Sequence, residues 1–102
     1  MKKIKLSREP IKNLQGEIIV TAGRPLLLRD TIANVLQSAP ADKGGSAKAM
    51  SIAMKFLEKD TVELPNEDYE YVKKLMKDAG LSNVVDWNLD KLFEKTVTLK
   101  DK

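Results

Sequence analysis

The spacing of apolar residues changes once along this chain, and that change limits the folds open to it. In the first 21 residues apolar side chains either alternate with polar ones, as in residues 3–6, or gather as a β-branched run in residues 17–21. Both patterns are typical of strands, whose successive side chains point to opposite faces. From Ile32 onward apolar residues recur every three or four positions, which is the period of an amphipathic helix. The sequence therefore predicts an α+β fold with strands first and helices after them.

Two breaks delimit the predicted strands. Pro10 ends the first, because proline has no N–H to donate to a neighbouring strand. Gly16 suits the positive φ of a tight turn over residues 13–16, and Pro25 follows the end of the second strand. We therefore expect an N-terminal β-hairpin over residues 2–21.

Helices are expected at about residues 30–39, 47–59, 66–79 and 84–95. Pro40 stops the first, Ser46 is a natural N-cap for the second, Pro65 opens the third, and Gly80 closes it. Residues 61–64 are compatible with a short strand or an extended linker, and the tail 96–102 is expected to fray.

The chain has 102 residues, enough for one ordinary domain and too few for two. With one Trp, two Tyr and two Phe, its core must be mainly aliphatic. Neither the hairpin nor any single helix can bury its own apolar face, so they must share a core. We expect residues 1–102 to form a single small domain, an N-terminal β-hairpin packed with three to four short helices.

The chain contains no Cys and no His. A disulfide scaffold, a Cys/His zinc site, a thiol nucleophile and a histidine-based triad are thereby excluded. Residues 44–46, Gly-Gly-Ser, lack the spacing of a phosphate-binding loop and are interpreted as a loop with a helix cap. Ser51 and Lys55 share a helix face, but a lysine on the polar side stays protonated and is no base. The sequence therefore predicts no enzyme, no catalytic residue, no metal site and no cofactor.

No apolar run approaches the roughly 18 residues of a membrane span. The basic start at residues 1–5 is not followed by the apolar stretch of a signal peptide. We expect a cytoplasmic protein with no membrane association.

One candidate partner surface lies in the last predicted helix. Asp86, Asp90 and Glu94 are spaced by four residues, so they share a helix face that suits a basic partner. Trp87 lies beside this row. If the helix begins before Trp87, the indole is exposed and can anchor an interface. If Asp86 is the N-cap, Trp87 folds over the core instead, which the usual burial of tryptophan favours.

A second candidate surface lies in the predicted helix 47–59. Met50 and Met54 extend its apolar side to more than half of the circumference. Methionine at the margin of an apolar stripe suits an adaptable contact with a partner or with a second copy. The alternative is a central helix that is buried on most sides.

The N-terminal region is basic, with seven Lys or Arg against two acidic residues in positions 1–29. Such a surface suits nucleic acid, although the predicted hairpin offers no aromatic side chain on which a base could stack. The candidate contacts are Lys2, Lys3, Lys5, Arg8, Lys12 and Arg24.

The order of these signals resembles small proteins of tailed bacteriophages and prophages. The resemblance covers residues 4–93. It rests on residues 14–18 after a basic strand, residues 28–36, the Lys/Ala/Met-rich segment Lys48–Phe56, and residues 62–64 before Glu67–Tyr69. It implies an accessory or assembly role. We therefore predict a non-catalytic protein–protein interaction module, with a protein partner or self-association, and a nucleic-acid-associated regulator as the alternative.

Overall fold

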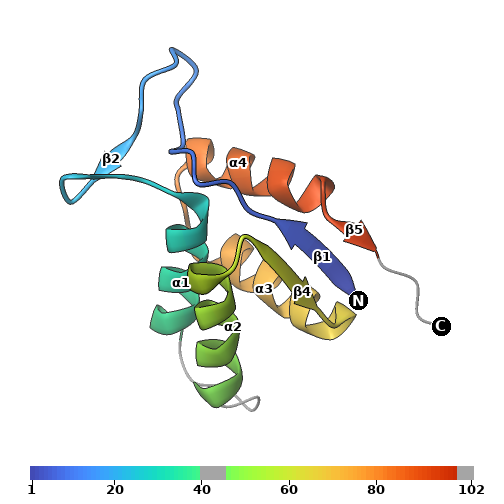
Figure 1. Ribbon diagram of the computed structural model, residues 1–102. Coiled ribbons are helices and arrows are strands. Elements are labelled where there is room, and N and C mark those ends of the chain that lie inside the picture. Colours follow the sequence, from blue (N-terminus) through green and yellow to red (C-terminus); the bar gives the residue numbers. More distant parts are fainter. Residues whose placement is uncertain (40–45, 99–102) are drawn as a thin grey trace.

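A computed structural model describes residues 1–39 and 46–98 of the chain, and within them it confirms the α+β class (Figure 1). The described part forms one domain with two small antiparallel sheets. Its helices are α1 (Leu28–Ser38), α2 (Ser46–Glu58), α3 (Asn66–Asp78) and α4 (Asn83–Glu94), all within two residues of the predicted ranges. Its strands are β1 (Lys2–Lys5), β2 (Val20–Thr21), β3 (Arg24–Pro25), β4 (Thr61–Leu64) and β5 (Val97–Thr98).

The larger sheet has the order β4-β1-β5, with β1 antiparallel to both neighbours. Ile4 lies opposite Val62, and both side chains are fully buried. Along β4 the buried Val62 and Leu64 alternate with exposed neighbours, as a strand with one covered face requires. The segment 61–64 is thus a strand, and its partner lies almost sixty residues away in sequence.

The predicted hairpin over residues 2–21 is therefore wrong in its pairing. The turn at its centre exists, since Gly16 has φ +81° and its N–H donates to the carbonyl of Asn13. It closes only a small loop, with Lys12 bridged to Ile18. Residues 11–26 instead form an arm that carries β2 and β3 and projects from the body (Figure 1). The base of the arm is anchored by Ile11, which is buried in the core. β1 pairs with β4 because that register buries Ile4 in the common core.

The helices and the larger sheet share one core. α1 lies against α2 and α3, while α3 lies beside β4 and α4 beside β1. Aliphatic residues dominate, as the composition predicts. The largest fully buried side chains are Phe56, Ile4, Ile32, Leu36, Leu64, Met76, Leu89, Val62 and Val72.

The end of the described chain differs from the prediction of a frayed tail. Val97 and Thr98 form β5 and pair with Lys3 and Lys2, because β1 would otherwise present an unpaired edge on that side. Residues 99–102 lie outside the described residues, as do the predicted stop at Pro40 and the loop 41–45. The capping role assigned to the Ser46 side chain also falls outside what the structure describes.

Candidate functional site

Helix α2 carries apolar side chains on two sides, one buried and one exposed. Ala49, Ile52, Ala53 and Phe56 face the core and are buried. On the other side Met50, Met54 and Leu57 are 45%, 53% and 44% exposed. The interpretation of α2 as a helix buried on most sides is therefore wrong.

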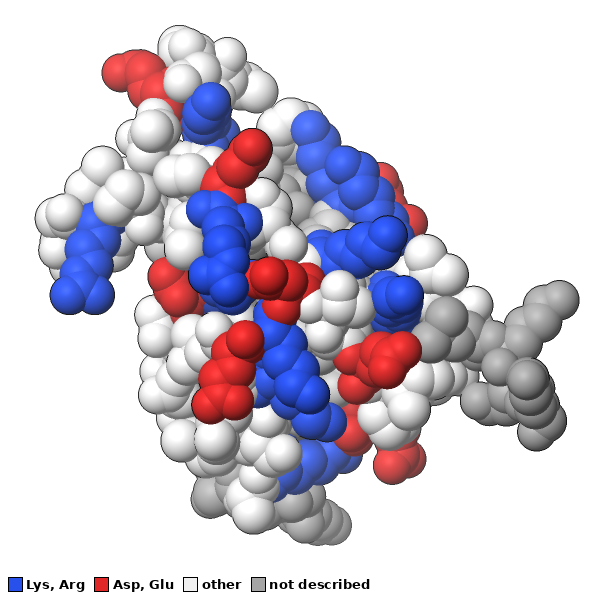
Figure 2. All heavy atoms as spheres, viewed as in Figure 1, with Lys and Arg blue, Asp and Glu red and all other residues white. Residues whose placement is uncertain are grey.

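The exposed apolar residues follow a regular spacing. Together with the exposed Ala47, they stand three, four and three positions apart, and we call Ala47, Met50, Met54 and Leu57 the α2 seam. This is the spacing with which one helix presents a narrow stripe to another. In the part of the molecule where Figure 1 places α2, the space-filling view shows uncharged atoms next to acidic and basic side chains (Figure 2).

Polar contacts fix both ends of the α2 seam to the body. At the C-terminal end the buried Arg29 of α1 donates to the Leu57 carbonyl at 3.5 Å and to Asp60 at 2.9 Å. Arg8 binds the same carboxylate at 3.0 Å. Near the N-terminal end Lys48 binds Asp68 of α3 at 2.9 Å, and this hydrogen bond raises the pKa of Lys48. The α2 seam is thus a surface held on a fixed helix.

Trp87 lies on the surface of α4. The helix begins at Asn83, with Ser82 as its N-cap, so Trp87 falls in the helical region and its side chain is 47% exposed. Burial of Trp87 in the core, which its residue type favours, is therefore wrong. The Lys91 ammonium lies 3.5 Å from the centre of the indole, one turn further along the helix. The role of Trp87 as a partner anchor stays a prediction.

The acidic row beside Trp87 is partly neutralised within the chain. Lys77 of α3 reaches both Asp90, at 2.6 Å, and Asp86, at 3.4 Å, and the hydrogen bond to Asp90 raises the pKa of Lys77. Glu94 is exposed and has no ion pair among the described residues. Asp86 and Asp90 therefore join α4 to α3 within the chain, and only part of the negative charge of the row is left for a partner.

The six basic residues proposed for nucleic acid do not form one patch. Lys2 donates to Thr98, and Arg8 is bound to Asp60. Lys12 and Arg24 lie on the arm, away from β1.

Lys5 instead joins two lysines that the sequence reading missed. With Lys91 and Lys95 of α4 it lines a groove of about 380 Å³, whose lining also includes Glu9 and Asn88. Lys91 and Lys95 are four residues apart on α4. This four-residue spacing of two lysines is visible in the sequence, but only the fold shows that α4 lies beside β1 and hence beside Lys5.

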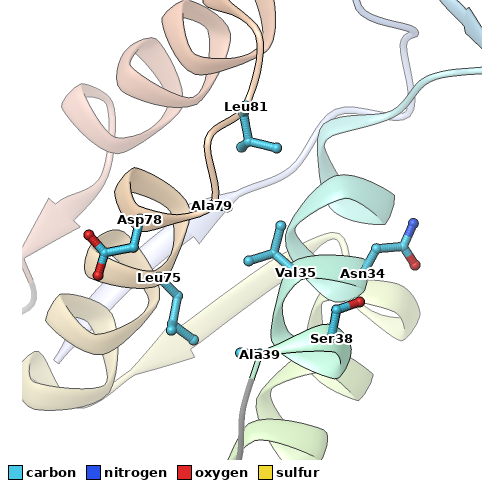
Figure 3. A pocket seen from close by; sticks show the side chains of 8 residues that line it. All are labelled: Asn34, Val35, Ser38, Ala39, Leu75, Asp78, Ala79 and Leu81. Carbon is cyan, nitrogen blue, oxygen red and sulfur yellow. The ribbon is translucent and has the colours of Figure 1, made fainter.

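A second pocket of about 380 Å³ lies between α1 and the end of α3 (Figure 3). Val35 and Leu81 point toward its centre, whereas the Asp78 carboxylate and the Asn34 amide point away from it (Figure 3). Val35, Leu81 and Asn34 also line a neighbouring hollow beneath the arm. The chemistry of this pocket suits an apolar side chain.

Comparison of the chain with family models, curated proteins and solved structures finds no match. The resemblance to phage proteins therefore stays a prediction. None of the helices in the described part of the chain is long and apolar enough to cross a membrane.

Proposed function

We propose that this chain is a non-catalytic protein-interaction module whose contact surface is the α2 seam. The observation that carries the proposal is the two-sided character of α2. One side of the helix is buried in the core, while Met50, Met54 and Leu57 on the other are about half exposed. A helix whose apolar residues extend well beyond its core-facing side is normally covered there as well. The accessory or assembly role implied by the phage resemblance is compatible with such a module.

Energetics favour a partner on the α2 seam. Apolar surface gains about 25 cal/mol for each Å² removed from water, so a few half-exposed large side chains contribute several kcal/mol when covered. The side chains of the α2 seam lie on a helix whose core-facing side is already packed, so little backbone conformational entropy is lost on binding.

The test compares proteins captured from a host lysate by three forms of the chain. The seam variant carries Met50→Gln, Met54→Gln and Leu57→Gln. The control variant carries Leu14→Gln and Val20→Gln, which alter apolar side chains of the arm that are 84% and 59% exposed. We expect the wild type and the control to capture the same proteins and the seam variant to lose them, with circular dichroism unchanged in all three. If the seam variant captured the same proteins as the wild type, the result would contradict the proposal.

A second candidate function, nucleic-acid binding, is favoured by the groove that Lys5, Lys91 and Lys95 line. None of the three has an ion pair among the described residues, although the Lys91 ammonium lies over the Trp87 ring. No carboxylate therefore neutralises these charges, and they can attract phosphates. The test is the anisotropy of a labelled oligothymidine at low salt. Reversal of these three charges to Glu should abolish binding, whereas Lys74→Glu, on an exposed part of α3, should not. No binding by the wild type at low salt would exclude this function.

A further inference from the structure

We infer that the α2 seam binds the α2 seam of a second copy of this chain, with the two helices antiparallel about a two-fold axis. This inference rests on the proposed function and names its partner. A seam with three-four-three spacing fits a helix that has the same spacing, because side chains of each helix insert between those of the other. A second copy supplies such a helix with the same side chains.

The sizes of the side chains favour the antiparallel direction. In an antiparallel pair centred near Ile52, Met50 lies opposite Met54, and Ala47 lies opposite Leu57. The smallest residue of the α2 seam then meets a large one, which fills the contact evenly. A parallel pair would set Ala47 against Ala47 and leave a gap at that end, while Leu57 met Leu57 at the other.

The charges at the ends of α2 point the same way. Glu58 is the last residue of α2, is exposed, and has no ion pair among the described residues. The antiparallel pair brings it to the positive N-terminal end of the other α2. A parallel pair would place both Glu58 carboxylates at one end and align the two helix dipoles. Opposite charges therefore meet only in the antiparallel pair.

The length of the α2 seam sets the expected strength. From Ala47 to Leu57 a helix rises about 15 Å, which is about one and a half heptads. A contact of that length alone is smaller than a standard stable interface, so we expect a reversible dimer with a dissociation constant of about 1 μM or weaker. Self-association should therefore depend on concentration in the micromolar range.

The chain contains no Cys, which allows a direct test of direction. Single variants Met50→Cys and Met54→Cys are oxidised under mild conditions, each alone and as an equal mixture. The antiparallel pair predicts that the mixed disulfide between the two variants forms several-fold faster than either homodimeric disulfide. Val20→Cys, on the exposed arm, serves as the background rate.

Sedimentation of the Cys-free chain over a range of concentrations completes the experiment. A dimer that the seam variant (Met50→Gln, Met54→Gln, Leu57→Gln) abolishes, together with preferred mixed disulfides, supports the inference. Homodimeric disulfides at position 50 that form faster than mixed ones would show a parallel pair and overturn it. A chain that stays monomeric at all concentrations, with cross-linking no faster than Val20→Cys, also overturns it. In that case seam-dependent capture of another protein would still leave the proposed function standing, and loss of both would overturn both.

Discussion

The contact that joins the end of α4 to α3 yields the most quantitative prediction. Tyr69 of α3 is 5% exposed, and its hydroxyl donates to the carbonyl of Phe93 at 3.1 Å. The two rings meet edge to face, with centroids 5.8 Å apart. The substitution Tyr69→Phe removes the hydroxyl and keeps the ring, so it isolates the hydrogen bond.

The loss of stability caused by this substitution depends on which hydrogen bonds the Phe93 carbonyl keeps. A buried acceptor left without a partner costs about 1–3 kcal/mol. This carbonyl also accepts the backbone N–H groups of Lys95 and of Thr96, the latter at 3.1 Å, so it stays paired. We therefore expect Tyr69→Phe to cost only about 1 kcal/mol, the net value of a typical hydrogen bond. For a domain of this size that corresponds to a fall in Tm of roughly 4–8 °C.

Urea denaturation followed by circular dichroism measures the change, with an unchanged m-value as the sign that only stability has shifted. Tyr69→Leu is the comparison, because it also removes the edge-to-face contact and the positions of Lys2 and Lys73 over the ring, at 5.5 and 5.3 Å. Tyr69→Leu should lower the free energy of unfolding by at least about 1 kcal/mol more than Tyr69→Phe does. A loss above about 3 kcal/mol for Tyr69→Phe would refute the reasoning, since it would mean that the carbonyl depends on the hydroxyl alone.

Three further outcomes follow from the structure. The hydrogen bond from Arg29 holds the pKa of Asp60 below its ordinary value. The stability it contributes is therefore present at neutral pH and lost as the pH falls through and below about 3.9, so acid should lower the Tm of the wild type more than that of Asp60→Asn. Phe56→Ala, at a fully buried position, should lower the free energy of unfolding by about 3–5 kcal/mol in urea titration. Ala22 and Gly23 both have positive φ at the turn of the arm. Because Asn adopts this conformation more readily than Ala, Ala22→Asn should raise the free energy of unfolding by up to about 1 kcal/mol. A lower free energy of unfolding for this variant would show that the turn tolerates alanine without strain.

The helices could be predicted from the sequence because their signals are local. Apolar spacing fixes which side of each helix faces the core, and Pro65 and Gly80 mark the two ends of α3 within a residue or two. Strand pairing carries no such local signal. β1 pairs with β4 and β5. This pairing is determined by burial in the shared core and not by the turn at residues 13–16 that follows β1 in the sequence.

The candidate site was predictable only in part, for a related reason. Apolar residues at positions 50 and 54 identify α2 as apolar on more than one side, but which side is covered depends on where α1 and α3 lie. The exposure of Trp87 likewise depends on a helix start four residues earlier, at Asn83. The groove that Lys5, Lys91 and Lys95 line joins residues more than eighty positions apart and requires the tertiary fold.

The two surfaces proposed for this chain must respond to salt in opposite ways. Contacts between the α2 seams are apolar, so sulfate, which strengthens the burial of apolar surface, should favour the dimer. Binding of phosphates by the lysine-lined groove releases counterions and should weaken steeply as salt rises. A titration of sodium sulfate that strengthens self-association while it weakens oligothymidine binding would assign each activity to its own surface. If both activities weakened together, the dimer would depend on the attraction of Glu58 to the N-terminal end of the other α2 more than on Met50, Met54 and Leu57. The apolar argument for the α2 seam would then fail.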